Sequence, residues 1–232
     1  MRGDADGERL KLARLLADRD VEDLAFLEGI PAPELAAYRV RLTDALFSVD
    51  ETALKRTAEA SRLLPIGLMA TIGERGLGPL VCARVCGHLE LQRAVDVAAK
   101  LPAAFCGQVA AELDPRKAIA LVSAMEPERV AEVALQMAEQ GEHVAMGRFV
   151  GHLPTPTLAR CVTVLSDEDL VRIAFVMDGA ERIDEIAAML DDRRLASVAS
   201  GGERGALTEE AGSISERLGA TQAARVRELR AA

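Results

Sequence analysis

The sharpest candidate for chemistry in the sequence is a group of two cysteines and one histidine. Cys82 and Cys86 would share one face of a helix, and His88 lies close enough to add a third ligand. Thiolate and imidazole groups bind zinc or iron, so this group could form a metal or redox-sensing site. Both cysteines also occupy apolar positions of a repeat described below, as do Cys106 and Cys161. A buried cysteine behaves as a small hydrophobic side chain, and we therefore favour core packing for all four.

Other catalytic patterns are absent from the sequence. It has no Gly-x-Ser-x-Gly elbow, no Gly-x-x-x-x-Gly-Lys phosphate loop and no Gly-x-Gly-x-x-Gly after a strand. Carboxylate pairs such as Asp191 with Asp192 and Glu209 with Glu210 are interpreted as solvated surface, although they could add to a weak Mg²⁺ site. His143 lies between two repeat units and has no partner that the sequence identifies. We therefore expect a protein that is not an enzyme and needs no cofactor, with weak Mg²⁺ binding as the one exception.

A helical repeat extends over much of the chain. Apolar residues at positions i, i+3, i+4 and i+7, here called slots, recur about every 12 residues and mark one face of a helix. Nine consecutive units follow the rule, from Cys82, Val85, Cys86 and Leu89 to Ile183, Ile186, Ala187 and Leu190, with one longer step of 16 residues before Met146. Prolines between units suit the first turn of the next helix. These observations predict an all-α fold, an α-solenoid or superhelix of short units of about 12 residues.

The repeat divides the chain into three predicted segments. Residues 1–63 form an N-terminal helical segment or cap, residues 64–200 the repeat array, and residues 206–231 a C-terminal amphipathic helix after a Gly-rich hinge. This last helix, or helix pair interrupted near Gly219, either seals the final repeat or binds a partner. A Gly-His pair at 87–88 and again at 151–152 is expected to end a helix, with the glycine releasing the chain into a turn.

Composition and charge narrow the possible functions. Hydrophobic residues make up 50% of the chain, yet it has only five Phe, one Tyr and no Trp, which favours close-packed helices and argues against an aromatic-lined cofactor pocket. A net charge of −9 argues against nucleic-acid binding. No apolar stretch is long enough to span a membrane and no signal peptide is evident, so we predict a cytoplasmic protein with reduced cysteines. The basic residues include only four lysines, a bias that we attribute to codon usage.

The proline-punctuated units have a counterpart in a known family. Leu-Pro or Asp-Pro pairs precede Ala-, Leu- and Val-rich helices that end in Leu or Met, as from Leu101-Pro102 to Leu113-Asp114-Pro115. Over roughly residues 82–191 this pattern resembles the cytosolic N-terminal domain of MgtE magnesium transporters, and the middle region of the flagellar motor switch protein FliG is similar. The resemblance implies a right-handed superhelix of short helices and a regulatory response to Mg²⁺. The sequence after residue 191 shows neither the regulatory domains nor the membrane helices of a transporter, so the resemblance does not imply transport.

Three functions are consistent with these features. The leading hypothesis is a non-enzymatic protein–protein interaction or regulatory module that binds a protein or peptide on the solenoid surface or on the C-terminal helix. The first alternative is a regulatory domain that responds to a divalent cation, Mg²⁺. The second is a metal or redox sensor that uses Cys82, Cys86 and His88. The oligomeric state is left open.

Overall fold

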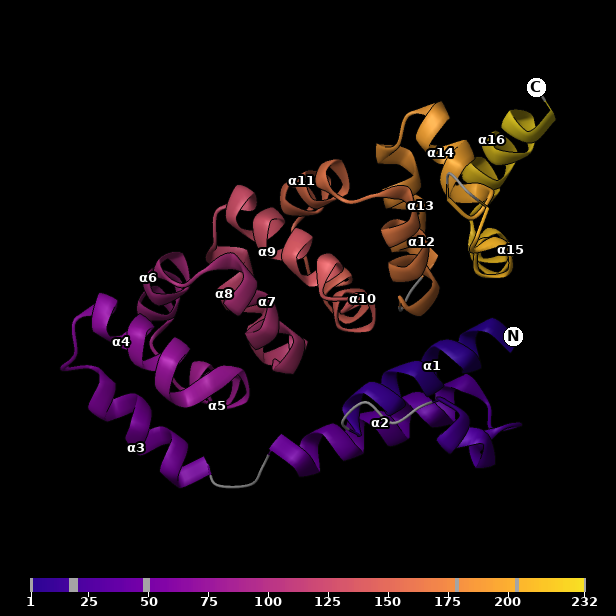
Figure 1. Cartoon of the computed structure of the whole chain (residues 1–232). Helices are drawn as coiled ribbons and strands as arrows, with labels where there is room; N and C mark the ends of the chain where they lie inside the picture. Colours follow the sequence, from indigo (N-terminus) through magenta and orange to yellow (C-terminus); the bar gives the residue numbers. More distant parts are fainter. Residues whose placement is uncertain (1, 17–20, 48–50, 178–179, 203–204, 232) are drawn as a thin grey trace.

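The computed structural model describes residues 2–16, 21–47, 51–177, 180–202 and 205–231 (Figure 1). Every regular element in these ranges is helical, and the all-α prediction is confirmed. The helices are α1 (Arg2–Leu15), η1 (Val21–Leu27), α2 (Ala32–Phe47), α3 (Glu51–Ser61), α4 (Ile66–Ile72), η2 (Gly73–Leu77), α5 (Gly78–Cys86), α6 (Leu91–Lys100), α7 (Ala103–Glu112), α8 (Pro115–Ala124), α9 (Pro127–Glu139), α10 (His143–Val150), α11 (Thr155–Val164), α12 (Asp167–Val176), α13 (Ala180–Met189), α14 (Asp192–Ala199), α15 (Thr208–Arg217) and α16 (Ala220–Ala231).

Each predicted repeat unit corresponds to one helix. From α6 to α13 every helix begins three residues before the first slot of its unit. Pro115 and Pro127 occupy the first turns of α8 and α9, and Ser166 and Asp169 form a capping box at the start of α12. The longer step before Met146 reflects a longer helix, α9, followed by a turn at Gly141 with φ of 79°. His143 is therefore the first residue of α10 and does not lie in a loop between units.

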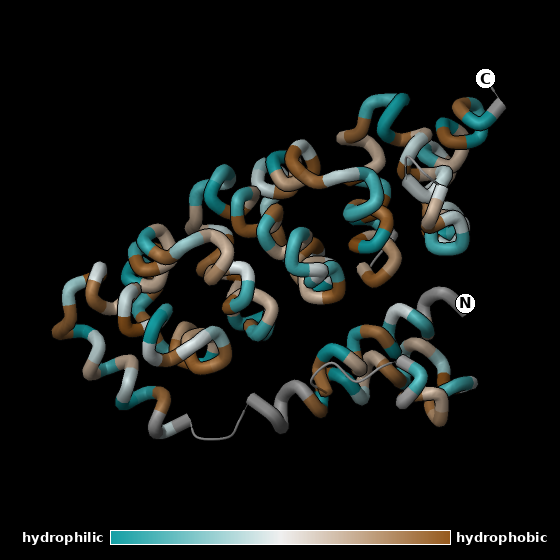
Figure 2. Tube along the Cα trace, in the orientation of Figure 1, coloured by the Kyte–Doolittle hydropathy of each residue, from teal (hydrophilic) through white to brown (hydrophobic). Residues whose placement is uncertain are grey.

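The helices of the array pack on their neighbours two positions along the chain. One row runs α3, α5, α7, α9, α11 and α13, and helices of the alternate set pair as α4 with α6, α6 with α8, α10 with α12 and α12 with α14. Figure 2 shows apolar and polar residues interleaved along each helix, as burial of one face requires. The short helices thus stabilise one another in series, which confirms the predicted solenoid.

Arginines join helices that lie three positions apart. Arg93, Arg129, Arg182 and Arg194 each occupy the third residue of a helix and donate to the carbonyls that end a helix about 30 residues earlier. For example, Arg129 Nη2 donates to Ala98 O at 3.0 Å. A guanidinium presents several donors in a fixed fork and suits the negative end of a helix, whereas lysine offers a single ammonium. The excess of arginine over lysine therefore has a structural reason besides codon usage.

The C-terminal segment consists of two helices that seal the array. Ala211 and Ile214 of α15 and Val226 of α16 are buried in the main core together with residues of α10–α14. The chain turns between the helices at Gly219, whose N–H donates to the Asp184 carboxylate at 2.8 Å. A Cβ atom on Gly219 would lie against that carboxylate, so a larger residue here would displace the Asp184 side chain. The predicted interruption is confirmed, and the apolar face of this helix pair is covered by the array.

The N-terminal helices form a separate unit with its own small core. Leu12, Ala13, Leu24 and Leu35 of α1, η1 and α2 pack together. The unit rests on the array where α1 contacts α10 and α12, and Arg14 Nε donates to Glu142 at 3.0 Å. Figure 1 shows this unit opposite α10 and α12, with α3 leading from it into the array. Because α3 packs on α5, residues 51–61 belong by their contacts to the repeat array and not to the N-terminal unit.

The two Gly-His pairs lie at the ends of helices and in turns, as the sequence predicted. Gly87 and Gly151 follow α5 and α10 but keep right-handed φ values of −64° and −60°. Other residues adopt this conformation freely, so the helix ends do not depend on glycine. His88 is half-buried and His152 is exposed.

Candidate functional site

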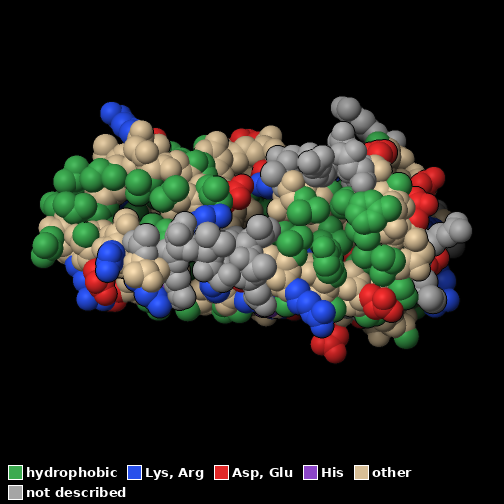
Figure 3. Space-filling view, turned by 90° about the horizontal axis from the view of Figure 1, so that it is seen from below, with side chains coloured by type: hydrophobic (Ala, Val, Ile, Leu, Met, Phe, Trp, Pro, Cys, Tyr) green, Lys and Arg blue, Asp and Glu red, His purple; other side chains and the backbone are tan. Residues whose placement is uncertain are grey.

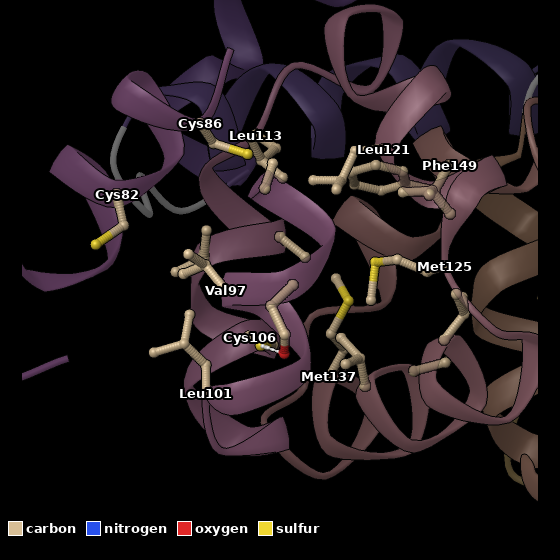
Figure 4. Close-up of a pocket in the computed structure, with 18 of the residues that line it drawn as sticks. Cys82, Cys86, Val97, Leu101, Cys106, Leu113, Leu121, Met125, Met137 and Phe149 are labelled. Atoms are coloured by element: carbon tan, nitrogen blue, oxygen red, sulfur yellow. Dashed lines mark hydrogen bonds between the residues drawn. The ribbon is translucent and has the colours of Figure 1, made fainter. Parts of the chain in front are cut away.

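An elongated apolar cavity of about 580 Å³ runs through the interior of the array. It is lined by side chains from α3 to α13, and Figure 4 shows several of them around a common space. The lining reproduces the sequence repeat, since all four slot residues of α5, α6, α7, α9, α10 and α11 contribute to it. The slots therefore mark the wall of a cavity as well as contacts between helices.

Slots in the two halves of the array differ in burial. In α11 the four slot residues Leu158, Cys161, Val162 and Leu165 are all buried. In α6 only Ala94 is buried, and Val97, Ala98 and Leu101 are half-buried. The slots of the first half of the array are therefore less completely buried than those of the second half. The halves also differ in the size of the first slot, which is Cys or Ala in α5–α8 and Val, Met, Leu or Ile in α9–α13.

The chemistry of the lining is almost wholly aliphatic. No charged side chain lines the cavity among the described residues, and the hydroxyl groups in its wall are those of Thr57 and Ser61 on α3. Among the described residues, Phe149 is the only aromatic one that lines the cavity. Such a wall offers no acid, base or metal ligand other than thiols, and it favours hydrocarbon.

The two cysteines and the histidine of the predicted metal group do not converge. No cluster of three or more His, Cys, Asp or Glu residues that could hold a metal ion occurs in the described parts of the chain. Cys82 is half-buried, with its thiol directed to Gly73 O at 3.4 Å. Burial raises the pKa of Cys86 to about 11, which disfavours the thiolate that binds metals and reacts with oxidants. Cys82, Cys86, Cys106 and Cys161 all line the cavity as small apolar residues.

His143 has a partner that the sequence did not reveal. Its Nε2 atom lies 2.7 Å from Asp169 Oδ1, which connects α10 to α12 outside the cavity. Burial acts to raise the pKa of Asp169, but hydrogen bonds from Ser166 and His143 outweigh this effect and the pKa is lowered. The pair is thus a structural link between neighbouring helices.

The carboxylate pairs considered for Mg²⁺ serve mainly to position helices. Asp191 caps α14 by accepting from the Arg194 N–H at 2.8 Å, and Asp192 pairs with Arg225 at 2.6 Å. Glu209 and Glu210 lie in the first turn of α15, where negative charge complements the helix dipole. Asp191 and Asp192 thus have partners within the protein.

Comparison with protein-family models, with curated proteins and with solved structures gave no match. Within the described residues, no helix is both long and apolar enough to cross a membrane.

Proposed function

We propose that the protein is a binding module that holds an elongated apolar ligand inside its helical array. The observation that supports the proposal is the cavity of about 580 Å³, whose wall is built from the slots of successive repeats. Its volume lies within the range of about 300–1,000 Å³ that is typical of small-molecule sites. The ligand class that best fits this wall is a single long hydrocarbon chain, such as that of a fatty acid.

Exposure of the apolar wall to water favours an occupant. Lining residues such as Val97 and Leu101 are half-buried and Ile72 is exposed, so water reaches the wall of the empty cavity. A hydrocarbon ligand removes apolar surface from water, at about 25 cal/mol per Å², and binding should therefore stabilise the array.

The chemistry of the lining distinguishes hydrocarbon from polypeptide. The wall is apolar apart from thiols and the hydroxyl groups of Thr57 and Ser61. An extended peptide would place its N–H and C=O groups against an aliphatic wall that cannot bind them.

The functions predicted from the sequence concern other surfaces. A protein or peptide partner was expected on the solenoid surface or on the C-terminal helix, whose apolar residues are buried against the array. Binding of such a partner to the outer surface stays a prediction, as does a response to Mg²⁺ implied by the resemblance to MgtE domains. The proposed function rests on the cavity alone and depends on neither of these two predictions.

A pair of adjacent alanines provides the test. Ala98 lines the cavity, whereas Ala99, the next residue of α6, is exposed. We expect the purified protein to bind a fluorescent fatty acid saturably at concentrations below micelle formation. Ala98→Phe should place a ring in the cavity and weaken this binding at least about tenfold, because several buried methylene groups lose their place at about 0.8 kcal/mol each. The control Ala99→Phe should bind like the wild type.

Thermal unfolding completes this experiment. Ala98→Phe should be at least as stable as the wild type without ligand, since it fills apolar space, and the fatty acid should stabilise the wild type and Ala99→Phe but not Ala98→Phe. Equal affinity of the two variants, or the absence of saturable binding by the wild type, would contradict the proposal.

A further inference from the structure

Exposed apolar side chains gather at the α3–α5 end of the array. Of the 13 large hydrophobic residues that are exposed in the described structure, six fall between positions 63 and 81. Leu63 is the most exposed of all, at 91%. We call this set the mouth surface, and it comprises Leu63, Leu68, Ile72, Leu77, Leu80 and Val81. Figure 3 shows hydrophobic side chains gathered over this end of the molecule, at the left. Scattered apolar residues are ordinary on a protein surface, but a concentration of this kind marks an interaction site.

The mouth surface is continuous with the cavity. Ile72 and Leu77 are exposed at 39% and 40% and also belong to the cavity wall. Leu64 and Met69, from the same stretch of chain, are half-buried and line the cavity as well. Leu63, Leu68, Leu80 and Val81 are exposed but do not line it. An apolar path therefore leads from the protein surface at α4, η2 and α5 into the interior.

The charge of this end differs from that of the rest of the chain. Residues 51–89 carry five basic residues, Lys55, Arg56, Arg62, Arg75 and Arg84, against three acidic ones, Glu51, Glu59 and Glu74. The segment therefore has a net charge of +2, while the complete chain has −9 and the remainder −11. Exposed apolar residues on a segment of net positive charge are the combination that binds the interface of an anionic membrane.

We propose that the mouth surface docks on an anionic lipid bilayer and lets a lipid hydrocarbon chain pass between that bilayer and the cavity. This proposal rests on the proposed function for its second half. A second copy of the chain is a poorer occupant, because a two-fold interface would bring two positively charged ends together. An anionic bilayer instead supplies opposite charge at its surface and hydrocarbon beneath it.

Flotation with lipid vesicles tests the docking surface. The wild type should float with vesicles of phosphatidylcholine plus phosphatidylglycerol, and high salt or omission of phosphatidylglycerol should weaken the binding. The double variant Leu63→Asp/Leu80→Asp should bind about 100-fold more weakly, since each buried leucine contributes about tenfold. The matched control is Phe26→Asp/Tyr38→Asp, which adds the same charge and removes two exposed apolar residues of the N-terminal unit. It should bind like the wild type.

The fatty-acid assay separates the two proposals. Leu63 and Leu80 do not line the cavity, so their double variant should keep its affinity for a soluble fatty acid and its helical circular dichroism spectrum. Fatty-acid binding without vesicle binding by the wild type would overturn the docking proposal and leave the proposed function standing. Equal vesicle binding by the wild type and the Leu63/Leu80 variant would also overturn it. So would a wild-type dimer, seen by sedimentation, that this variant abolishes while vesicles remain unbound.

Discussion

Substituting Arg194 should reveal how strongly the arginine contacts hold successive helices together. Its Nη1 and Nη2 atoms donate to Val162 O and Leu165 O at 2.8 and 2.7 Å, and Nε donates to Asp167 at 2.8 Å. One side chain thus joins the start of α14 to the end of α11 and the start of α12. Arg194→Met keeps an apolar stem but removes all three donors, so it tests the hydrogen bonds separately from packing.

The expected loss of stability follows from these three contacts. A hydrogen bond to a charged group contributes about 1.5–3 kcal/mol, but 27% of the Arg194 side chain is exposed, and the freed carbonyls can partly bind water. We therefore expect Arg194→Met to lower the free energy of unfolding by about 2–4 kcal/mol, well below the sum of three full contributions. For a chain of this length the loss corresponds to a fall in Tm of about 4–16 °C.

The neighbouring arginine provides the control. Arg193 is exposed, and Arg193→Met changes the net charge equally, so its effect should stay within about 0.5 kcal/mol. Arg194→Lys should recover less than half of the loss, because a single ammonium cannot reach three acceptors in different directions. Urea and thermal unfolding measure all three variants. Equal losses for Arg193→Met and Arg194→Met would refute the structural role of the fork and leave only a general effect of charge.

Three further predictions concern packing, acid stability and thiols. Gly147→Ala should lower the free energy of unfolding, measured with a chemical denaturant, by about 1–3 kcal/mol, because its Cβ would lie 2.6 Å from a Val176 methyl group. Gly151→Ala is the control and should be tolerated, because the space around Gly151 is open. The pKa of Asp169 is lower in the folded protein than its unfolded value of 3.8, so its carboxylate stabilises the fold fully above pH 3.8 and this contribution is lost as the pH falls through the folded pKa. Asp169→Asn should therefore be less stable than the wild type at neutral pH. Its stability should also change less with pH below pH 4. A thiol reagent at mildly alkaline pH should modify half-buried Cys82 long before Cys161, whose pKa burial raises to about 11. Equal rates for the two thiols would show that the array opens as a whole.

Local features of the fold could be predicted from the sequence, and contacts between distant units could not. The 12-residue period and the prolines gave the helix starts because both act within one helical turn. The contact between His143 and Asp169 joins residues 26 positions apart, and the arginine contacts join residues about 30 apart. Their distances depend on superhelical pitch, which periodicity does not encode. Arginine recurs at the third residue of α6, α9, α13 and α14, and this recurrence in the sequence could have indicated the arginine contacts.

The pattern of slots does not predict the cavity, because it gives the direction in which a side chain points and not the distance to the opposite wall. The sequence nevertheless carries that information in the size of the first slot, which is Cys82, Ala94, Cys106 and Ala118 in the first four units and Val130 or a larger residue afterwards. All slot residues of α11 to α13 are buried, whereas several of those of α5 to α8 are only half-buried. The scarcity of aromatic residues therefore has two consequences. It permits thin helical layers to stack in series, and it leaves room inside the array, where we propose that a hydrocarbon chain binds.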